Sequence, residues 1–286
     1  MKKMTIISGK GGTGKTSLVG CFAVLADRRA VLVDGDVDAA NLSLITGPTL
    51  VEEYEFRATK VAEIDRESCN SCGLCRDLCR FAAIYEDYIV DPASCEGCGF
   101  CFYACPHNAV QMKEKLSGRW FISRTPYGTL IHARLGIAEE NSGKLVTTIR
   151  NKGQELAEAG HKEYLIIDGP PGIGCPVIAS LSGVDAALIV TEPTVSGIHD
   201  LERVHTVCKH FGVKAAVCIN RFDLGKVQSA AIEKYCYEEE IAVAGKISFD
   251  RAFVEAMVQG MPVVEYNTGP LSRQIREVWD TFSSLS

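Results

Sequence analysis

A glycine-rich octapeptide near the N-terminus has the residue types of a phosphate-binding loop. Residues 9–16 read Gly-Lys-Gly-Gly-Thr-Gly-Lys-Thr, which fits the pattern G-x-x-x-x-G-K-[ST]. Glycines allow backbone N–H groups to turn toward phosphate oxygens, Lys15 can reach the β- and γ-phosphates, and Thr16 can bind Mg²⁺. The alternative is an ordinary tight turn. Such a turn does not require this full octapeptide between an apolar run and a helix-length segment. The residues expected to contact a nucleotide are Gly11, Gly12, Thr13, Gly14, Lys15, Thr16 and Ser17.

Eight of the 13 cysteines form two copies of one spacing. The copies are Cys69-x-x-Cys72-x-x-Cys75-x-x-x-Cys79 and Cys95-x-x-Cys98-x-x-Cys101-x-x-x-Cys105. In this spacing three thiolates bind one [4Fe-4S] cluster, and the offset fourth binds the neighbouring cluster. Zinc is the alternative, but zinc ribbons lack the third and the offset fourth cysteine. The expected ligand sets are Cys69, Cys72, Cys75 and Cys105 for one cluster, and Cys95, Cys98, Cys101 and Cys79 for the other. The segment resembles bacterial ferredoxins with two clusters, except that Arg80 replaces their usual proline.

A second lysine distinguishes the phosphate-binding loop. With Lys10, the loop resembles the deviant Walker A loop of the MinD, ParA and nitrogenase iron-protein ATPases, and the resemblance extends over most of the chain outside the cysteine-rich segment. It implies ATP as the ligand and a homodimer in the ATP state. It also implies that Lys10 crosses to the partner's nucleotide, where it stabilises phosphoryl charge as Lys15 does in its own subunit. An ordinary solvated lysine is the alternative for Lys10.

Acidic residues after two apolar runs complete the predicted catalytic site. Residues 34–42 are similar to the first switch segment of this family, and residues 164–173 to its Walker B strand and second switch. We expect Asp36 to orient the attacking water. The alternative is that these aspartates only cap the segments that follow them. The expected Mg²⁺ ligands are Thr16, Asp34 and Asp168.

Two further positions take their interpretation from the same family. Asn220 and Arg221 follow an apolar run and resemble the adenine-binding element, although such a pair also occurs in ordinary turns. Cys175 follows the second switch, at a place similar to the ligand of the interface cluster in the nitrogenase iron protein. The second ligand of that cluster has no clear counterpart here, so a structural thiol is the favoured interpretation of Cys175.

Strands and helices alternate around these residues. Short apolar runs bounded by Gly, Asp or Pro predict buried strands at residues 4–8, 30–33, 164–167, 186–190 and 215–219. Helix-length segments occupy residues 15–27, 143–160, 197–211 and 230–240. The alternation predicts the α/β class, with a mostly parallel P-loop sheet flanked by helices and with ligands at the carboxyl ends of its strands.

The alternation stops after Asn41, where the cysteine-rich segment begins. We expect a small inserted ferredoxin-like α+β domain at residues 58–116, between the N-terminal part of the ATPase domain at 1–57 and its remainder at 117–286. Between Glu52 and Lys115, 12 acidic and 7 basic residues carry −5 of the formal net charge of −6. An acidic region suits a basic protein partner, and a basic face for nucleic acid is not expected.

Composition predicts a globular protein of the cytoplasm. The 286 residues are 47% hydrophobic, which suffices for one large core and a small second one. We expect neither a membrane-spanning helix nor a signal peptide. In a reducing compartment the cysteines would bind metal rather than form disulfides. An apolar stripe at residues 271–282 is expected to pack on the core rather than bind a membrane, because few cations accompany it.

These patterns predict an Mg²⁺-dependent ATPase that holds two [4Fe-4S] clusters. The main hypothesis is a homodimer that couples ATP to electron transfer with a redox partner or a metalloenzyme that has a basic docking face. Two alternatives stay open. One is an ATP-dependent carrier or assembly factor for iron–sulfur clusters, and the other is a MinD-like positioning ATPase whose cluster domain senses redox state.

Overall fold

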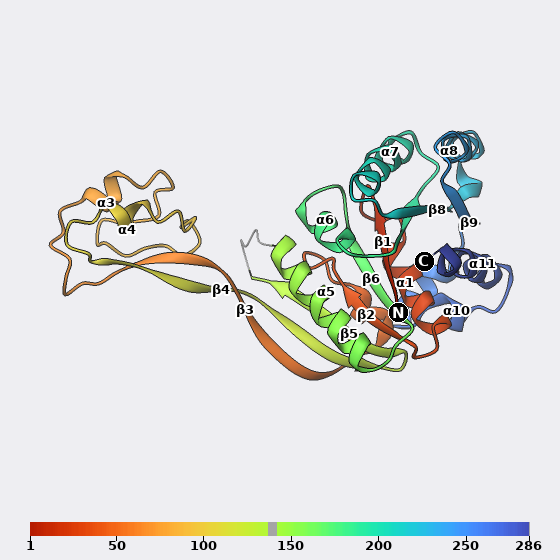
Figure 1. Cartoon of the computed structure of the whole chain (residues 1–286), viewed down its shortest axis with the longest axis horizontal. Coiled ribbons are helices and arrows are strands. Elements are labelled where there is room, and N and C mark those ends of the chain that lie inside the picture. Colours follow the sequence, from red (N-terminus) through yellow and green to blue (C-terminus); the bar gives the residue numbers. More distant parts are fainter. Residues whose placement is uncertain (137–141, 286) are drawn as a thin grey trace. The chain divides into compact units, whose positions relative to one another are not determined.

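The computed structural model describes residues 1–136 and 142–285 (Figure 1). The chain forms two compact units. The larger unit comprises Met1–Tyr54, Trp120–Arg134 and Ser142–Ser286, and the smaller unit comprises Glu55–Arg119 and Leu135–Asn141. The cysteine patterns therefore fall in the smaller unit, and the phosphate-binding loop falls in the larger one.

A sheet of nine strands in the order β3-β4-β5-β2-β6-β1-β7-β8-β9 organises the larger unit. The strands are β1 (Lys2–Ser8), β2 (Ala30–Asp34), β3 (Thr49–Ile64), β4 (Val110–Thr125), β5 (Gly128–Leu135), β6 (Tyr164–Pro171), β7 (Ala186–Thr191), β8 (Lys214–Asn220) and β9 (Ala242–Ile247). Pairing is parallel from β5 through β2, β6, β1, β7 and β8 to β9. The predicted α/β class is confirmed, and β9 is a strand that the sequence analysis did not predict.

Helices cover both faces of the parallel strands. They are α1 (Lys15–Leu25), α2 (Leu42–Thr46), α5 (Ser142–Ala159), α6 (Cys175–Leu181), α7 (Val195–His210), α8 (Lys226–Glu238), α9 (Ala252–Val258), α10 (Val263–Tyr266) and α11 (Pro270–Leu285), with a 3₁₀ turn at Phe222–Leu224. Ile6 of β1 packs into the core under α1 and α11, whereas Ile7 packs into the core under α7 and α8 (Figure 1). Consecutive side chains of this strand therefore point to opposite faces of the sheet.

The apolar stripe near the C-terminus packs into the core, as expected. Trp279 of α11 lies with its ring centroid 5.2 Å from that of Phe22 in α1 and 5.2 Å from that of Tyr164 in β6. Phe282 is fully buried beside them. Within the described residues, no helix combines the length and the apolar character needed to cross a membrane.

The predicted site segments meet at the carboxyl edge of the sheet. β1 leads into the phosphate-binding loop, β2 leads into residues 34–42, and β6 carries residues 164–171. Asp34 and Asp168 are register partners on the adjacent strands β2 and β6. Because parallel strands all end at the same edge, segments that are far apart in the sequence come together there.

A half-buried histidine makes the larger unit sensitive to acid. His132 of β5 shares a 3.0 Å hydrogen bond with Ser123 of β4. Burial, with a smaller effect of Arg134, lowers the pKa of His132 to about 4. The unfolded chain therefore binds a proton here below a pH of about 6.5, whereas the folded chain does not. The stability that neutral His132 contributes to the fold is fully present above a pH of about 6.5 and is lost as the pH falls toward 4.

We therefore expect acidification from pH 7 to pH 5 to lower the free energy of unfolding by about 1 kcal/mol through His132, after discounting for its partial exposure. Urea unfolding at both pH values checks this. His132→Gln should remove that part of the pH dependence, whereas His161→Gln, at an exposed position, should retain it. Equal pH dependence in both variants would contradict the assignment.

The smaller unit has a small core in which cysteines pack among apolar side chains. Parts of β3 and β4 accompany two short helices, α3 (Leu74–Asp77) and α4 (Phe100–Ala104). The buried members of the core are Ala62, Ile64, Cys75, Ile84 and Val110. Five further cysteines pack against them, namely Cys69, Cys79, Cys95, Cys101 and Cys105. The thiols therefore point toward the interior of this unit.

Candidate functional site

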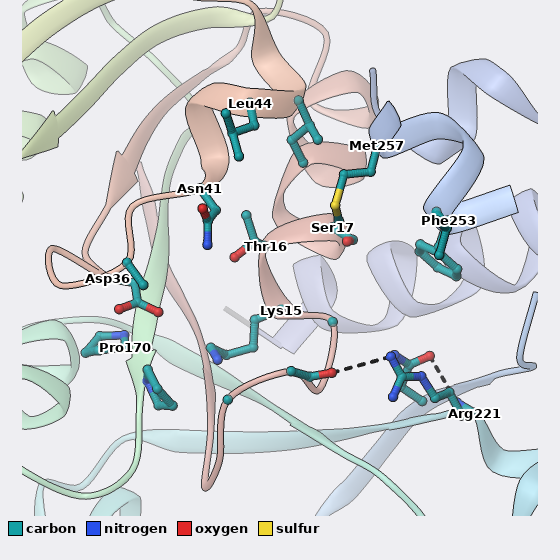
Figure 2. Close-up of a pocket in the computed structure, with 18 of the residues that line it drawn as sticks. Lys15, Thr16, Ser17, Asp36, Asn41, Leu44, Pro170, Arg221, Phe253 and Met257 are labelled. Atoms are coloured by element: carbon teal, nitrogen blue, oxygen red, sulfur yellow. Dashed lines mark hydrogen bonds between the residues drawn. The ribbon is translucent and has the colours of Figure 1, made fainter. Parts of the chain in front are cut away.

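A cavity of about 670 Å³ lies at the carboxyl edge of the sheet in the larger unit (Figure 2). This volume falls in the range of cofactor pockets, roughly 300–1,000 Å³. The predicted residues that line it are Gly11, Gly12, Gly14, Lys15, Thr16, Ser17, Asp36, Asn220 and Arg221. The structure therefore brings the phosphate-binding loop, the first switch segment and the predicted adenine-binding element to one cavity.

Lys15 is held at the start of α1 with its charge nearly buried. Its Nζ donates a hydrogen bond of 2.9 Å to the Ser8 hydroxyl. Burial lowers the pKa of Lys15, and the nearby carboxylates of Asp168 and Asp36 oppose that effect. Gly14 precedes the helix with φ of 93°, and a Cβ there would lie 2.6 Å from Asn220 Nδ2. The loop thus turns tightly enough to present a buried cation to a phosphate.

Asp168 offers an unpartnered carboxylate beside this cation. It is fully buried, and neither of its oxygens has a hydrogen-bond partner among the described residues. Burial raises the pKa of Asp168, although the nearby Thr16 hydroxyl and Lys15 oppose the rise. A buried carboxylate without a partner is costly in free energy. The donor set of Asp168 and Thr16 therefore fits a hard cation such as Mg²⁺.

Asp34 and Asp36 have different surroundings although two residues separate them. Asp34 is fully buried and accepts N–H hydrogen bonds from Leu42 at 3.0 Å and from Asp36 at 3.3 Å. It thereby fixes the start of α2, which is the capping alternative considered for these aspartates. Asp36 is half-buried and lines the cavity. Burial raises its pKa and the proximity of Lys15 lowers it.

Asn220 and Arg221 brace the phosphate-binding loop. Asn220 Nδ2 donates to the Thr13 carbonyl at 2.8 Å, and Asn220 Oδ1 accepts from the Arg221 N–H at 3.0 Å. The Arg221 guanidinium donates to the Gly12 carbonyl at 3.4 Å. Part of the hydrogen-bonding capacity of Asn220 is therefore used to hold the loop, and the rest faces the cavity.

Lys10 is paired within its own chain. Its Nζ lies 3.3 Å from Glu192 Oε2 and 3.5 Å from the Thr194 hydroxyl. These contacts hold the Lys10 ammonium beside the end of β7.

Residues 4–263 match the family model described as the CobQ/CobB/MinD/ParA nucleotide binding domain. The chain belongs to this family. An uncharacterized protein of Methanocaldococcus jannaschii is 36% identical over 228 residues, which are 79% of this chain and 80% of that relative. The cell division ATPase MinD of Pyrococcus furiosus gives a TM-score of 0.61 at 19% identity, covering 100% of this chain and 99% of that structure. Septum site-determining MinD of Pyrococcus horikoshii, complexed with Mg-ADP, gives 0.60 at 19% identity, covering 98% and 94%.

Membership of the MinD/ParA family confirms the predicted nucleotide-binding domain. The predicted enzyme class, a P-loop ATPase, is the class of this family. At these identities the likeness to the solved structures shows the fold. The comparisons support the MinD-like alternative better than ATP-gated electron transfer, and they do not extend to the predicted clusters.

One wall of the cavity was missed by the sequence analysis. It is built by residues after β9 and in α9, and by the short helix α2 (Figure 2). Its members are Leu44, Ile45, Ser248, Phe249, Asp250, Phe253, Val254 and Met257. The available signal was the short apolar run at 241–244. If this run is a parallel strand, its carboxyl end lies at the same edge of the sheet.

In the smaller unit, the eight motif cysteines line two separate small cavities. The first cavity is lined by Cys69, Cys72, Cys75 and Cys105, and the second by Cys79, Cys95, Cys98 and Cys101. These sets are the ones that the crossed ligand pattern predicts. The offset cysteine of each motif thus lies with the three leading cysteines of the other.

Backbone N–H groups approach the sulfur atoms of the first set. Ser71 donates to Cys69 Sγ at 3.4 Å, and Ala109 donates to Cys105 Sγ at 3.3 Å. Among the described residues, no three His, Cys, Asp or Glu side chains converge closely enough to hold a single metal ion. In a [4Fe-4S] cluster each cysteine binds a different iron, so its ligands do not need to converge on one point. The donor sets therefore fit such clusters better than zinc.

The five cysteines outside the motifs differ in exposure. Cys21, Cys208, Cys218 and Cys236 are buried, whereas Cys175 is exposed at the start of α6. Burial raises the pKa of Cys218 to about 12, so this thiol is inert. Among the described residues of the larger unit, Cys175 is the only exposed cysteine.

Proposed function

We propose that this protein is an Mg²⁺-dependent ATPase whose homodimer closes when it binds ATP and opens after hydrolysis. The observation that carries the proposal is the buried carboxylate of Asp168, which has no hydrogen-bond partner among the described residues and lies near the ammonium of Lys15. Lys15 itself lines the cavity with the rest of the phosphate-binding loop. Family membership supports ATP as the ligand.

Each residue has a distinct part in this proposal. Lys15 neutralises charge on the β- and γ-phosphates, and Asp36 orients the attacking water. Thr16 and Asp168 would hold Mg²⁺, which neutralises phosphate charge when bound. Asp34 fixes the first switch segment beside them through its two backbone hydrogen bonds. Lys10 would reach the nucleotide of the partner subunit and stabilise the transferred phosphoryl charge.

We expect the protein to be a monomer with Mg-ADP and a dimer with a non-hydrolysable Mg-ATP analogue. Two nucleotides that each accept a lysine from the opposite subunit join the two chains, and loss of the γ-phosphate removes that contact. Sedimentation velocity with each nucleotide checks this expectation. The same sedimentation coefficient with both nucleotides would overturn the proposed switch, and absence of ATP-dependent phosphate release would overturn the enzyme assignment.

We further propose that the smaller unit binds two [4Fe-4S] clusters, one at each set of four cysteines. Bound clusters would supply one-electron redox chemistry. Support comes from the crossed ligand sets, from the N–H groups directed at sulfur, and from a small core in which six cysteines pack. Such a small unit needs the metal-bound state to hold its core together.

A second candidate role, electron transfer with a partner protein, is favoured by one observation. Phe81 and Phe100 line the second cysteine cavity and are 45% and 57% exposed. An apolar rim beside a redox group is suited to contact with another protein. Cluster content after many ATP turnovers with an apo-acceptor separates the roles: an electron carrier keeps its iron, whereas a cluster carrier loses it.

A further inference from the structure

Glu192 is an acidic residue beside the phosphate-binding loop that the proposed mechanism does not use. It directly follows β7 and is only 9% exposed. Its Oε2 lies 3.3 Å from Lys10 Nζ, and its Oε1 accepts a hydrogen bond from the Arg221 guanidinium. One nearly buried carboxylate therefore pairs with two cations that come from different strand ends.

The backbone around Glu192 fixes the place of this carboxylate. Thr194 donates its N–H to the Glu192 carbonyl at 2.8 Å, and the Thr194 hydroxyl accepts from the Gly197 N–H at 2.9 Å, which caps α7. A Cβ on Gly197 would lie 2.2 Å from the Glu192 carbonyl oxygen, so a glycine is required at this close approach. The strand end and the helix cap thus hold the backbone of Glu192 in position, and its carboxylate pairs with the two cations.

Lys10 is bound to this segment by two contacts. Besides Glu192, its ammonium meets the Thr194 hydroxyl at 3.5 Å, and its side chain is 33% exposed. Arg221, the other partner of Glu192, also contacts the loop, because its guanidinium donates a hydrogen bond to the Gly12 carbonyl. The loop is therefore tied to the ends of β7 and β8 through Glu192.

We propose that Glu192 is a positioning residue that retains Lys10 in its own subunit and thereby sets the threshold for ATP-dependent dimerisation. This inference rests on the proposed function, in which Lys10 reaches the partner's nucleotide. In that role the Lys10 side chain extends out of its own subunit, and its ammonium leaves Glu192. Closure therefore requires the Lys10–Glu192 pair to open, and the free energy of that pair opposes closure. Subunits without ATP stay apart because nothing replaces the contact.

Glu192→Gln tests the proposal because the amide keeps the shape and the hydrogen bond to Arg221 but loses the charge. Glu163→Gln is the matched control: it removes one carboxylate of an exposed ion pair, with Arg29 at 2.9 Å. Two quantities are measured. They are the dimer Kd with a non-hydrolysable Mg-ATP analogue, from sedimentation equilibrium, and the rate at which acetic anhydride labels Lys10 in nucleotide-free protein, from mass spectrometry.

We expect Glu192→Gln to tighten the dimer about fivefold and to raise Lys10 labelling about threefold, because a partly buried ion pair contributes on this scale. The control should change neither quantity. Unchanged Lys10 labelling, or a dimer no tighter than that of the control, would overturn the inference. If wild-type protein never dimerises with the analogue, the proposed switch fails, and the labelling rate still decides whether Glu192 retains Lys10. A merely structural role would weaken the dimer and lower the melting temperature instead.

Discussion

Replacing Asp36 by asparagine is expected to lower kcat for ATP hydrolysis by about 10²–10⁴-fold, the range in which groups that position or deprotonate a nucleophile act. Asp36 lines the nucleotide cavity, is half-buried, and lies near enough to Lys15 for each to shift the pKa of the other. The amide keeps the size of the side chain but cannot polarise water as the carboxylate does. Phosphate release measures kcat, and titration with a fluorescent ATP analogue measures binding.

Asp38 supplies the control for this experiment. It lines the same cavity two residues later, but it is exposed to solvent. Asp38→Asn should leave kcat within about twofold of wild type, since substitutions of side chains that are exposed to solvent have small effects. An equally small effect of Asp36→Asn would exclude Asp36 from the hydrolysis step. If Asp36→Asn weakens nucleotide binding and leaves kcat unchanged, Asp36 is a binding residue.

Local patterns in the sequence were sufficient to predict the parallel core and the phosphate-binding loop. The runs at β1, β2, β6, β7 and β8 are apolar throughout because both of their faces are buried, and this pattern requires no knowledge of their neighbours. The crossed cysteine sets follow from spacing in the same way, since the two motifs carry the same offset. Each of these features is visible in a short segment or in a repeated spacing, although the strands themselves pair with partners far away in the sequence.

Contacts between distant strand ends were beyond sequence reasoning. Glu192 is one acidic residue after an apolar run, and only the order of β1, β7 and β8 in the sheet brings it to Lys10 and Arg221. The use of Asp34 in two backbone hydrogen bonds is likewise a property of how α2 folds back. The sequence identified charged residues at the correct edge, whereas tertiary geometry decides which of them bind ligand and which hold the backbone.

Pairs of cysteine substitutions should show whether the ligand sets are crossed. Cys79 and Cys98 line the same cavity, whereas Cys72 lines the other one. We expect about eight irons per chain in the wild-type protein after anaerobic reconstitution, and about four in Cys79→Ser/Cys98→Ser, because both changes damage one cluster. Cys79→Ser/Cys72→Ser should retain close to none, because each change damages a different cluster. Iron and acid-labile sulfide are assayed on the same samples.

The two double variants remove the same number of thiols, so a general loss of folding would lower their iron content equally. The variants differ only in whether the two substituted cysteines line the same cavity or different cavities. The crossed pattern therefore predicts different iron contents for them. If each motif instead held its own cluster, Cys79 and Cys72 would belong together and the two results would be exchanged. Zinc in place of iron and sulfide would contradict the cluster assignment altogether. Cys175→Ser, in the larger unit, should retain the full wild-type content, because this exposed thiol lies outside both sets.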